Sequence, residues 1–186
     1  MEYPKIDLRE EQKVNENTHV HLLAGGRGSG KTRAGTEWVA TDPVTTLILA
    51  PDYSSARETI IEGESGLYYA ARSRGDDLFL DNREPPYFAS TYRFGKNNAH
   101  VFATGRERLV QVLGSINADV KAPVERVWID EAQGLPLRDW KLLHEAFPDA
   151  QYLLTFTPTS EKNKLLTYLY RRAGAFRPKY MLYSMS

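Results

Sequence analysis

The sequence predicts an α/β fold in which a mostly parallel β-sheet has helices on both faces and carries an added antiparallel hairpin. Two observations support this prediction. Short apolar runs alternate with helix-like runs along most of the chain, and parallel strands joined by helices produce that alternation. One pair of strand-like segments is instead separated by Gly95-Lys96-Asn97-Asn98, whose residues suit a hairpin turn.

The individual elements follow from hydrophobic pattern and from residues that begin or end them. Strands are expected over residues 20–24, 45–50, 89–94, 100–104, 124–130 and 151–155, and helices over 30–40, 54–62, 137–146 and 161–172. Residues 72–88 are crowded with charge and contain Pro85-Pro86, so we expect an exposed excursion there.

Composition indicates a single globular domain. The chain has 186 residues, an apolar fraction of 41% and no cysteine, so it can bury a core but has no thiolate nucleophile, thiolate zinc site or disulfide framework. No apolar run reaches the roughly 20 residues that span a bilayer, and the first residues do not resemble a secretory signal. Basic and acidic residues number 24 each, so any contact with nucleic acid must be local.

A glycine-rich stretch has the pattern of a phosphate-binding loop. Gly25-Gly26-Arg27-Gly28-Ser29-Gly30-Lys31-Thr32 fits G-x-x-x-x-G-K-[ST] and lies between a predicted strand and a predicted helix. The glycines let backbone N–H groups surround an anion, and the start of the helix adds partial positive charge. We expect Lys31 to reach the β- and γ-phosphates of a nucleotide and Thr32 to bind Mg²⁺, while the rest of the loop offers its backbone.

Two acidic residues end a later predicted strand, in Val127-Trp128-Ile129-Asp130-Glu131. An open parallel sheet binds ligands at the carboxyl ends of its strands. Asp130 is therefore expected to hold Mg²⁺, and Glu131 to orient the attacking water and accept its proton. Such a pair can instead cap the next helix, but its combination with Lys31 favours a P-loop NTPase of the additional-strand, catalytic-glutamate type. A water-activating glutamate favours hydrolysis over transfer to another acceptor.

A third polar position follows the strand expected at 151–155. Thr157 could sense the γ-phosphate, and its release on hydrolysis would then free the segment that follows. The alternative, that Thr157 caps the helix expected near Glu161, stays open.

Two other groups of residues could suggest metal sites. His19 and His21 share one strand face, for which packing at a strand edge is the preferred interpretation. Asp76, Asp77 and Asp81 are interpreted as part of the charged, exposed excursion.

Together these segments resemble the ATPase domain of the large terminase subunit, the DNA-packaging motor of tailed bacteriophages. The resemblance rests on the glycine loop with Arg27 inside it, the Walker A motif, and on the acidic strand end, the Walker B motif. The resemblance also includes two further segments, Ile61-Glu62-Gly63-Glu64-Ser65-Gly66-Leu67 and Thr157-Pro158. It extends along the chain from about Gln12 to Arg172.

The resemblance implies roles for several residues. Lys31, Thr32, Asp130 and Glu131 would act as argued above in a Mg²⁺-dependent ATPase. Arg27 would approach the γ-phosphate of ATP and Gln12 would read the adenine. Thr157 would couple hydrolysis to movement, although Phe156 stands where many relatives have threonine.

The arginine that acts on a neighbouring subunit is not found at its usual place. In relatives it often precedes a glycine shortly before the acidic strand, but here Leu113 precedes Gly114. Arg106 and Arg108 are the candidates, and Arg126 is a less favoured one. An arginine supplied in trans would stabilise charge on the transferred phosphate.

The resemblance also implies a biological role, in which ATP hydrolysis drives double-stranded viral DNA into a procapsid in the bacterial cytoplasm. The partners would be DNA, the portal protein, the small terminase subunit and copies of the chain in a ring, although the isolated domain is expected to be a monomer. No membrane partner is expected.

Residues 1–186 would form one ATPase domain. A nuclease domain is expected beyond residue 186, so this chain should have no nuclease activity. Two alternatives remain, a helicase-like ATPase that depends on nucleic acid, and an assembly module that binds nucleotide without turnover and docks on portal or small terminase.

Overall fold

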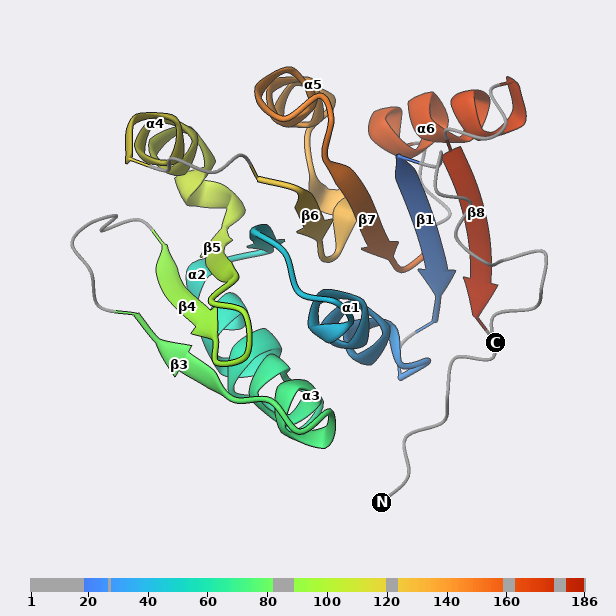
Figure 1. Cartoon of the computed structure of the whole chain (residues 1–186). Coiled ribbons are helices and arrows are strands. Elements are labelled where there is room, and N and C mark those ends of the chain that lie inside the picture. The colour runs from blue at the N-terminus through green and yellow to red at the C-terminus, as the bar shows by residue number, and fades with distance from the viewer. Residues whose placement is uncertain are drawn as a thin grey trace.

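The computed structural model describes residues 19–26, 28–81, 89–119, 124–158, 163–175 and 180–185. In these residues one eight-stranded sheet has the order β3-β4-β5-β2-β6-β7-β1-β8 (Figure 1). The strands are β1 Val20–Gly25, β2 Thr46–Ala50, β3 Leu78–Leu80, β4 Ser90–Phe94, β5 His100–Gly105, β6 Arg126–Ile129, β7 Gln151–Phe156 and β8 Tyr180–Met185.

Six neighbouring strands, from β5 to β8, run parallel to one another. β4 is antiparallel to both β5 and β3, so the expected hairpin between β4 and β5 is confirmed. β7 lies between β1, which leads into the glycine loop, and β6, which leads into the acidic pair. This inserted strand is the additional strand of the predicted fold class.

Helices cover both faces of the sheet (Figure 1). α1, the helical segment formed by α2 and the π-helix η2, and α3 lie on one face, and α4, α5 and α6 lie on the other. Their bounds are α1 Lys31–Ala40, α2 Tyr53–Ser55, η2 Ala56–Ile61, α3 Leu67–Ser73, α4 Leu109–Asp119, α5 Leu137–Ala146 and α6 Lys164–Ala175, with short 3₁₀ turns η3 Arg106–Arg108 and η4 Ala132–Gly134.

The two cores follow from the alternation of side chains along the central strands. In β2, Leu47 and Leu49 belong to the core under α4, α5 and α6. Ile48 and Ala50 belong to the core under α1, η2 and α3. All four are fully buried, which explains why β2 is an uninterrupted apolar run rather than an alternating one.

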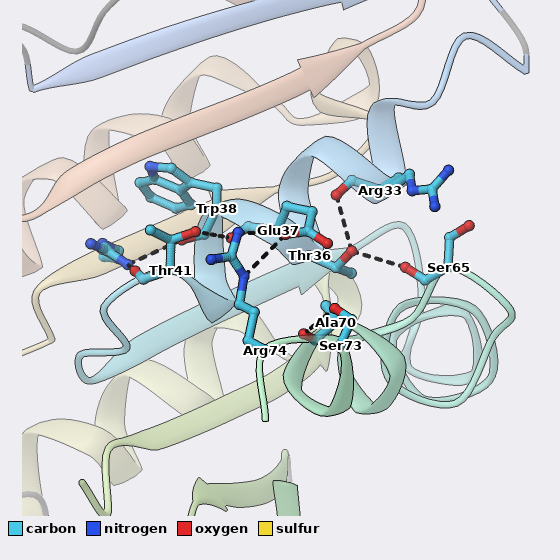
Figure 2. Close-up of polar contacts among 10 residues, drawn as sticks. Arg33, Thr36, Glu37, Trp38, Thr41, Ser65, Ala70, Ser73 and Arg74 are labelled. Atoms are coloured by element: carbon cyan, nitrogen blue, oxygen red, sulfur yellow. Dashed lines mark hydrogen bonds and ion pairs between the residues drawn. The ribbon is translucent and has the colours of Figure 1, made fainter. Parts of the chain in front are cut away.

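Polar contacts fasten α1 to the segment that follows η2. Thr36 Oγ1 donates a hydrogen bond to the carbonyl oxygen of Ser65 over 2.9 Å, and Arg74 Nη2 lies 2.6 Å from Glu37 Oε2 (Figure 2). The helix that carries Lys31 is therefore held both by the turn before α3 and by the end of α3.

Most predicted elements are confirmed, but the segment expected as an exposed excursion is partly structured. α3 ends at Ser73 and β3 pairs with β4, although Phe79 and Leu80 on β3 are exposed. Asp76 is buried rather than exposed, because its Oδ1 accepts the N–H groups of Asp77 and Lys96. Pro85 and Pro86 lie outside the described residues.

The interpretation of His19 and His21 as residues of a strand edge is wrong. β1 pairs with β7 on one side and with β8 on the other, and β8 was not expected from the sequence. His21 therefore lies in the interior of the sheet, with 3% of its surface exposed. The sequence also failed to predict α4, which packs against α5.

None of the described helices combines the length and the apolar character needed to cross a membrane.

Candidate active site

The polar residues singled out in the sequence lie at one edge of the sheet. β1, β5, β6 and β7 all run in the same direction, so the segments that follow them emerge at the same edge. These segments hold the glycine loop, Arg106, the pair Asp130-Glu131 and Thr157. Ligands of open parallel sheets bind at this edge.

The glycine loop has the backbone that its sequence predicts. Gly28 and Gly30 adopt φ values of 74° and 90°, which residues with a β-carbon rarely adopt. Gly30 is the N-cap of α1, and neither a side-chain cap nor an acidic residue occupies the first turn of that helix. The N–H groups of this turn and the dipole of the helix thus suit an anion.

Lys31 folds back over this loop. Its Nζ donates to the carbonyl oxygens of Gly25 and Gly26 over 2.7 and 2.8 Å, and only 7% of the residue is exposed. Its charge also acts on the carboxyl of Asp130, where it opposes the rise in pKa that burial causes. Lys31 and Asp130 follow two strands that are both parallel to β7, so the two residues lie at the same edge of the sheet.

Asp130 is buried and hydrogen-bonded. Burial raises the pKa of its carboxyl, the hydrogen bond from Thr155 lowers it, and the charge of Glu131 raises it. Thr155 Oγ1 donates to Asp130 Oδ1 over 2.8 Å and accepts from Trp128 Nε1 over 2.9 Å. Two neighbouring strands thus fix the direction of this carboxyl group.

These residues fit a Mg²⁺ ion that is shared with a nucleotide. Among the described residues, no group of three or more histidine, cysteine, aspartate or glutamate side chains could hold a metal by themselves. Mg²⁺ usually takes one or two protein oxygens together with substrate phosphates and water. Asp130 and the hydroxyl of Thr32 are the oxygens that the sequence assigns to this ion, and their role stays a prediction.

Glu131 is held at both its backbone and its side chain. Its backbone has φ 50° and ψ 50°, the left-handed conformation that is uncommon for a residue with a side chain. Its carbonyl oxygen accepts from Arg106 Nη1 over 3.3 Å, and its carboxylate accepts from Gln133 Nε2. Strained backbone of this kind persists where surrounding contacts impose it, often at functional sites.

Arg106 is half-buried beside the acidic pair of its own chain. Burial lowers the pKa of its guanidinium, and the nearby carboxylates of Glu131 and Asp130 raise it. A β-carbon at Gly134 would stand 2.2 Å from Arg106 Nη1, so the absence of a side chain there makes room for the arginine.

The other two arginines lie elsewhere. Arg108 stacks over the ring of Tyr53 at 4.0 Å from its centroid. Arg126 begins β6, at the end opposite to Asp130, and donates to the carbonyl oxygens of Trp38 and Thr41. Whether any of these arginines acts on a neighbouring subunit stays a prediction, and Gln12 and Arg27 lie outside the described residues.

Thr157 contacts the acidic segment through its backbone, because its N–H donates to Gln133 Oε1 over 3.2 Å. The alternative that Thr157 caps the following helix is wrong. α6 begins at Lys164, and Asn163 Oδ1 accepts the N–H of Leu166 over 2.9 Å, as an N-cap does.

Sequence reasoning missed three residues of this edge. Thr155 is a hydroxyl inside an apolar strand, and a buried polar group of that kind needs a partner. Asn163 precedes a helical pattern, which is a helix-start signal. For Gln133 no signal existed beyond its position two residues after Glu131, since its partners come from other parts of the chain.

No protein-family model matches the chain, and no curated protein matches it. Solved structures do match. The large terminase of a thermophilic bacteriophage in complex with ATP-γ-S aligns with a TM-score of 0.67 at 11% identity, over 96% of this chain and 42% of that chain. This chain shares its fold with about two fifths of a large terminase. The same terminase in complex with ADP gives a TM-score of 0.65 at 11% identity, with 96% and 42% covered.

A further crystal form of that terminase gives a TM-score of 0.68 at 11% identity, over 96% of this chain and 43% of that chain. The P-loop fold expected from the sequence is therefore confirmed. At this identity the terminase structures establish the fold alone. The chain spans about two fifths of their length, so the activity of a whole large terminase is not carried over with the fold.

Proposed function

We propose that this chain is a Mg²⁺-dependent ATPase whose hydrolysis drives the packaging of viral DNA. The observation that carries the proposal is the strand arrangement: β1 leads into the glycine loop with Lys31, β6 leads into Asp130-Glu131, and both are parallel to β7, so these segments emerge at one edge of the sheet. The solved terminase structures with ATP-γ-S and ADP support a nucleotide as the ligand.

Each residue has a chemical task in this proposal. The N–H groups of the glycine loop and the ammonium of Lys31 hold the phosphates of ATP, and Arg27 and Gln12 add contacts to the γ-phosphate and the adenine. Thr32 and Asp130 would hold Mg²⁺, which neutralises charge on the β- and γ-phosphates when bound. Lys31 must then exchange its carbonyl contacts with the loop for phosphate oxygens.

Glu131 acts on the attacking water. Its carboxylate accepts a proton from the water as the water oxygen bonds to the γ-phosphorus and the bond from that phosphorus to the bridging oxygen of ADP breaks. The products are ADP and inorganic phosphate. In this structure Oε2 of Glu131 accepts the hydrogen bond from Gln133, so Oε1 can take the proton directly, or the carboxylate can turn away from Gln133 toward the water.

The wider role rests on the terminase fold. In this proposal the chain forms a ring with its own copies at the portal of a procapsid, contacts double-stranded DNA and the small terminase subunit, and works in the bacterial cytoplasm. Thr157 would couple hydrolysis to movement. Residues 1–186 would be the ATPase domain, and nuclease activity would belong to a domain beyond them.

Two other functions remain as rivals. A helicase-like ATPase would share the same site but would continue into a second ATPase-like domain, whereas a terminase would continue into a nuclease domain. A module that binds nucleotide without turnover would not need Glu131 beside the γ-phosphate. A measurement of phosphate release separates this module from an ATPase, because the module would release no phosphate from ATP.

The deciding experiment measures phosphate release from ATP and Mg²⁺ by the purified chain and by Glu131→Gln. We expect Glu131→Gln to bind ATP as the unchanged chain does but to hydrolyse it about 10²- to 10⁴-fold more slowly, which is the usual contribution of a general base. Glu145→Gln, an exposed position on α5, is the matched control and should keep full activity. Equal turnover in Glu131→Gln would contradict the proposal.

A further inference from the structure

Gln133 joins the candidate general base to the segment that leads into α6. Its side-chain Nε2 donates to the carboxylate of Glu131, and its Oε1 accepts the backbone N–H of Thr157 over 3.2 Å. One amide group therefore contacts both the end of β6 and the end of β7, which are neighbouring strands.

The polarity of this amide fits both contacts in only one orientation. A carboxylate accepts hydrogen bonds and a backbone N–H donates them, so the NH₂ group must face Glu131 and the oxygen must face Thr157. A flipped amide would put oxygen against the carboxylate and N–H against N–H. The two contacts are therefore made together.

A second link continues toward α6. Asn163 Nδ2 donates to the backbone carbonyl of Gln133, and Asn163 Oδ1 accepts the N–H of Leu166 in the first turn of α6 over 2.9 Å. α6 packs against β8, which pairs with β1 beside the glycine loop (Figure 1). The short turn η4 that contains Gln133 is thus fixed to the start of α6.

We propose that Gln133 is a positioning residue that makes the carboxylate of Glu131 and the start of α6 move together. This inference rests on the proposed ATPase. When Glu131 turns to a water beside the γ-phosphate, it leaves the NH₂ of Gln133, and the amide then loses the partner that fixed its orientation toward Thr157. The start of α6, held through Asn163, shifts with η4.

This role differs from that of a residue that only fills space. Arg106 holds the backbone carbonyl of Glu131, so the strained backbone of Glu131 has a support that does not involve Gln133. The Gln133 side chain contacts the carboxylate of Glu131, which is the group that takes the proton in the proposed reaction. Loss of the Gln133 side chain should therefore lower turnover and change how α6 responds to bound nucleotide, while nucleotide binding itself stays unchanged.

Two variants separate the contacts. Gln133→Met keeps the length of the side chain and removes both hydrogen bonds. Gln133→Glu keeps an oxygen that can accept from Thr157 but sets a carboxylate against that of Glu131. Gln151→Met, at the start of β7 and the opposite edge of the sheet, is the matched control.

The experiment uses the purified chain with Mg²⁺ and a non-hydrolysable ATP analogue. Hydrogen exchange is measured in peptides that cover residues 163–175, and steady-state kinetics with ATP give kcat and KM. In the unchanged chain, the analogue should alter exchange in the first turn of α6. In Gln133→Met that response should disappear, kcat should fall by about tenfold or more, and analogue affinity and KM should stay within about twofold.

Gln133→Glu, which keeps the size of the side chain and an oxygen toward Thr157, should show the same loss of kcat. The inference is overturned if α6 in the unchanged chain does not respond to the analogue, or if a folded variant at position 133 keeps both the response and kcat. If the unchanged chain does not bind the analogue at all, the proposed function itself has failed, which is a distinct result.

Discussion

Thr155 and Asp130 are joined across two neighbouring strands, with Thr155 Oγ1 donating to Asp130 Oδ1 over 2.8 Å. The same hydroxyl accepts from the indole of Trp128, which is fully buried. The inserted strand β7 thus contributes directly to the acidic site, because the buried hydroxyl of Thr155 fixes the carboxyl group that would hold Mg²⁺.

Replacing Thr155 by valine should destabilise the protein. The change leaves the buried Trp128 N–H and an Asp130 oxygen without their partner, and an unsatisfied buried group costs about 1–3 kcal/mol. Urea unfolding should show a lower free energy of unfolding by that amount. Thr155→Ser keeps the hydroxyl, so its free energy of unfolding should fall by less. Equal stability of Thr155→Val and the unchanged chain would show that the hydroxyl does not hold this pair.

Replacing Lys31 by methionine should weaken nucleotide binding strongly. The variant keeps a long side chain but removes the ammonium that we expect to contact the phosphates. Binding of a fluorescent ATP analogue should weaken by at least about 10²-fold, since a hydrogen bond to a charged group contributes about 1.5–3 kcal/mol and the ionic attraction is lost as well. Lys141→Met, an exposed position on α5, is the control. Retained affinity in Lys31→Met would refute the assignment of the phosphate loop.

Mixing inactive variants tests whether an arginine acts between subunits. Glu131→Ala lacks the base, and Arg106→Ala or Arg108→Ala lacks a candidate arginine. If the arginine acts in trans, a mixture of the two inactive proteins should regain part of the phosphate release, because some interfaces combine an intact base with an intact arginine. Arg106 already contacts the carbonyl oxygen of Glu131 in its own chain. An Arg106→Ala variant that loses turnover and is not rescued would therefore have lost a contact within one chain.

His21 should make the protein less stable in mild acid. Burial lowers its pKa from 6.5 to about 4, so the unfolded chain binds a proton below pH 6.5 that the folded chain does not accept until about pH 4. The free energy of unfolding should fall by about 3 kcal/mol from this group as the pH decreases through that window. The difference in free energy of unfolding between the unchanged chain and His21→Asn should shrink toward low pH. A difference that stays constant from pH 7 to pH 4 would contradict the lowered pKa of His21.

Local patterns predicted the glycine loop, the acidic pair and the alternation of strands and helices. Each depends on residues that are close in sequence, such as the glycines at positive φ or the uninterrupted apolar run of β2. α4 was missed because its β-branched residues and Gly114 favour other structures, although Leu109, Val112 and Ile116 are buried at helical spacing.

The contacts within the site could not be predicted in the same way. Gln133 meets Thr157 and Asn163 only because β6 and β7 are neighbours in the sheet. The pairing of β8 with β1 joins two distant segments, and the error about His21 followed from missing it. Contacts of this kind depend on pairing between distant segments of the chain, which local patterns in the sequence do not show.

The central claim is that Lys31 and Glu131 act on one nucleotide, and a crystal structure of the chain with Mg²⁺ and a non-hydrolysable ATP analogue tests it most directly. We expect the γ-phosphate between the ammonium of Lys31 and the carboxylate of Glu131, with Mg²⁺ near Thr32 and Asp130. A nucleotide bound elsewhere, or a γ-phosphate that Glu131 cannot reach even through one water, would contradict this account.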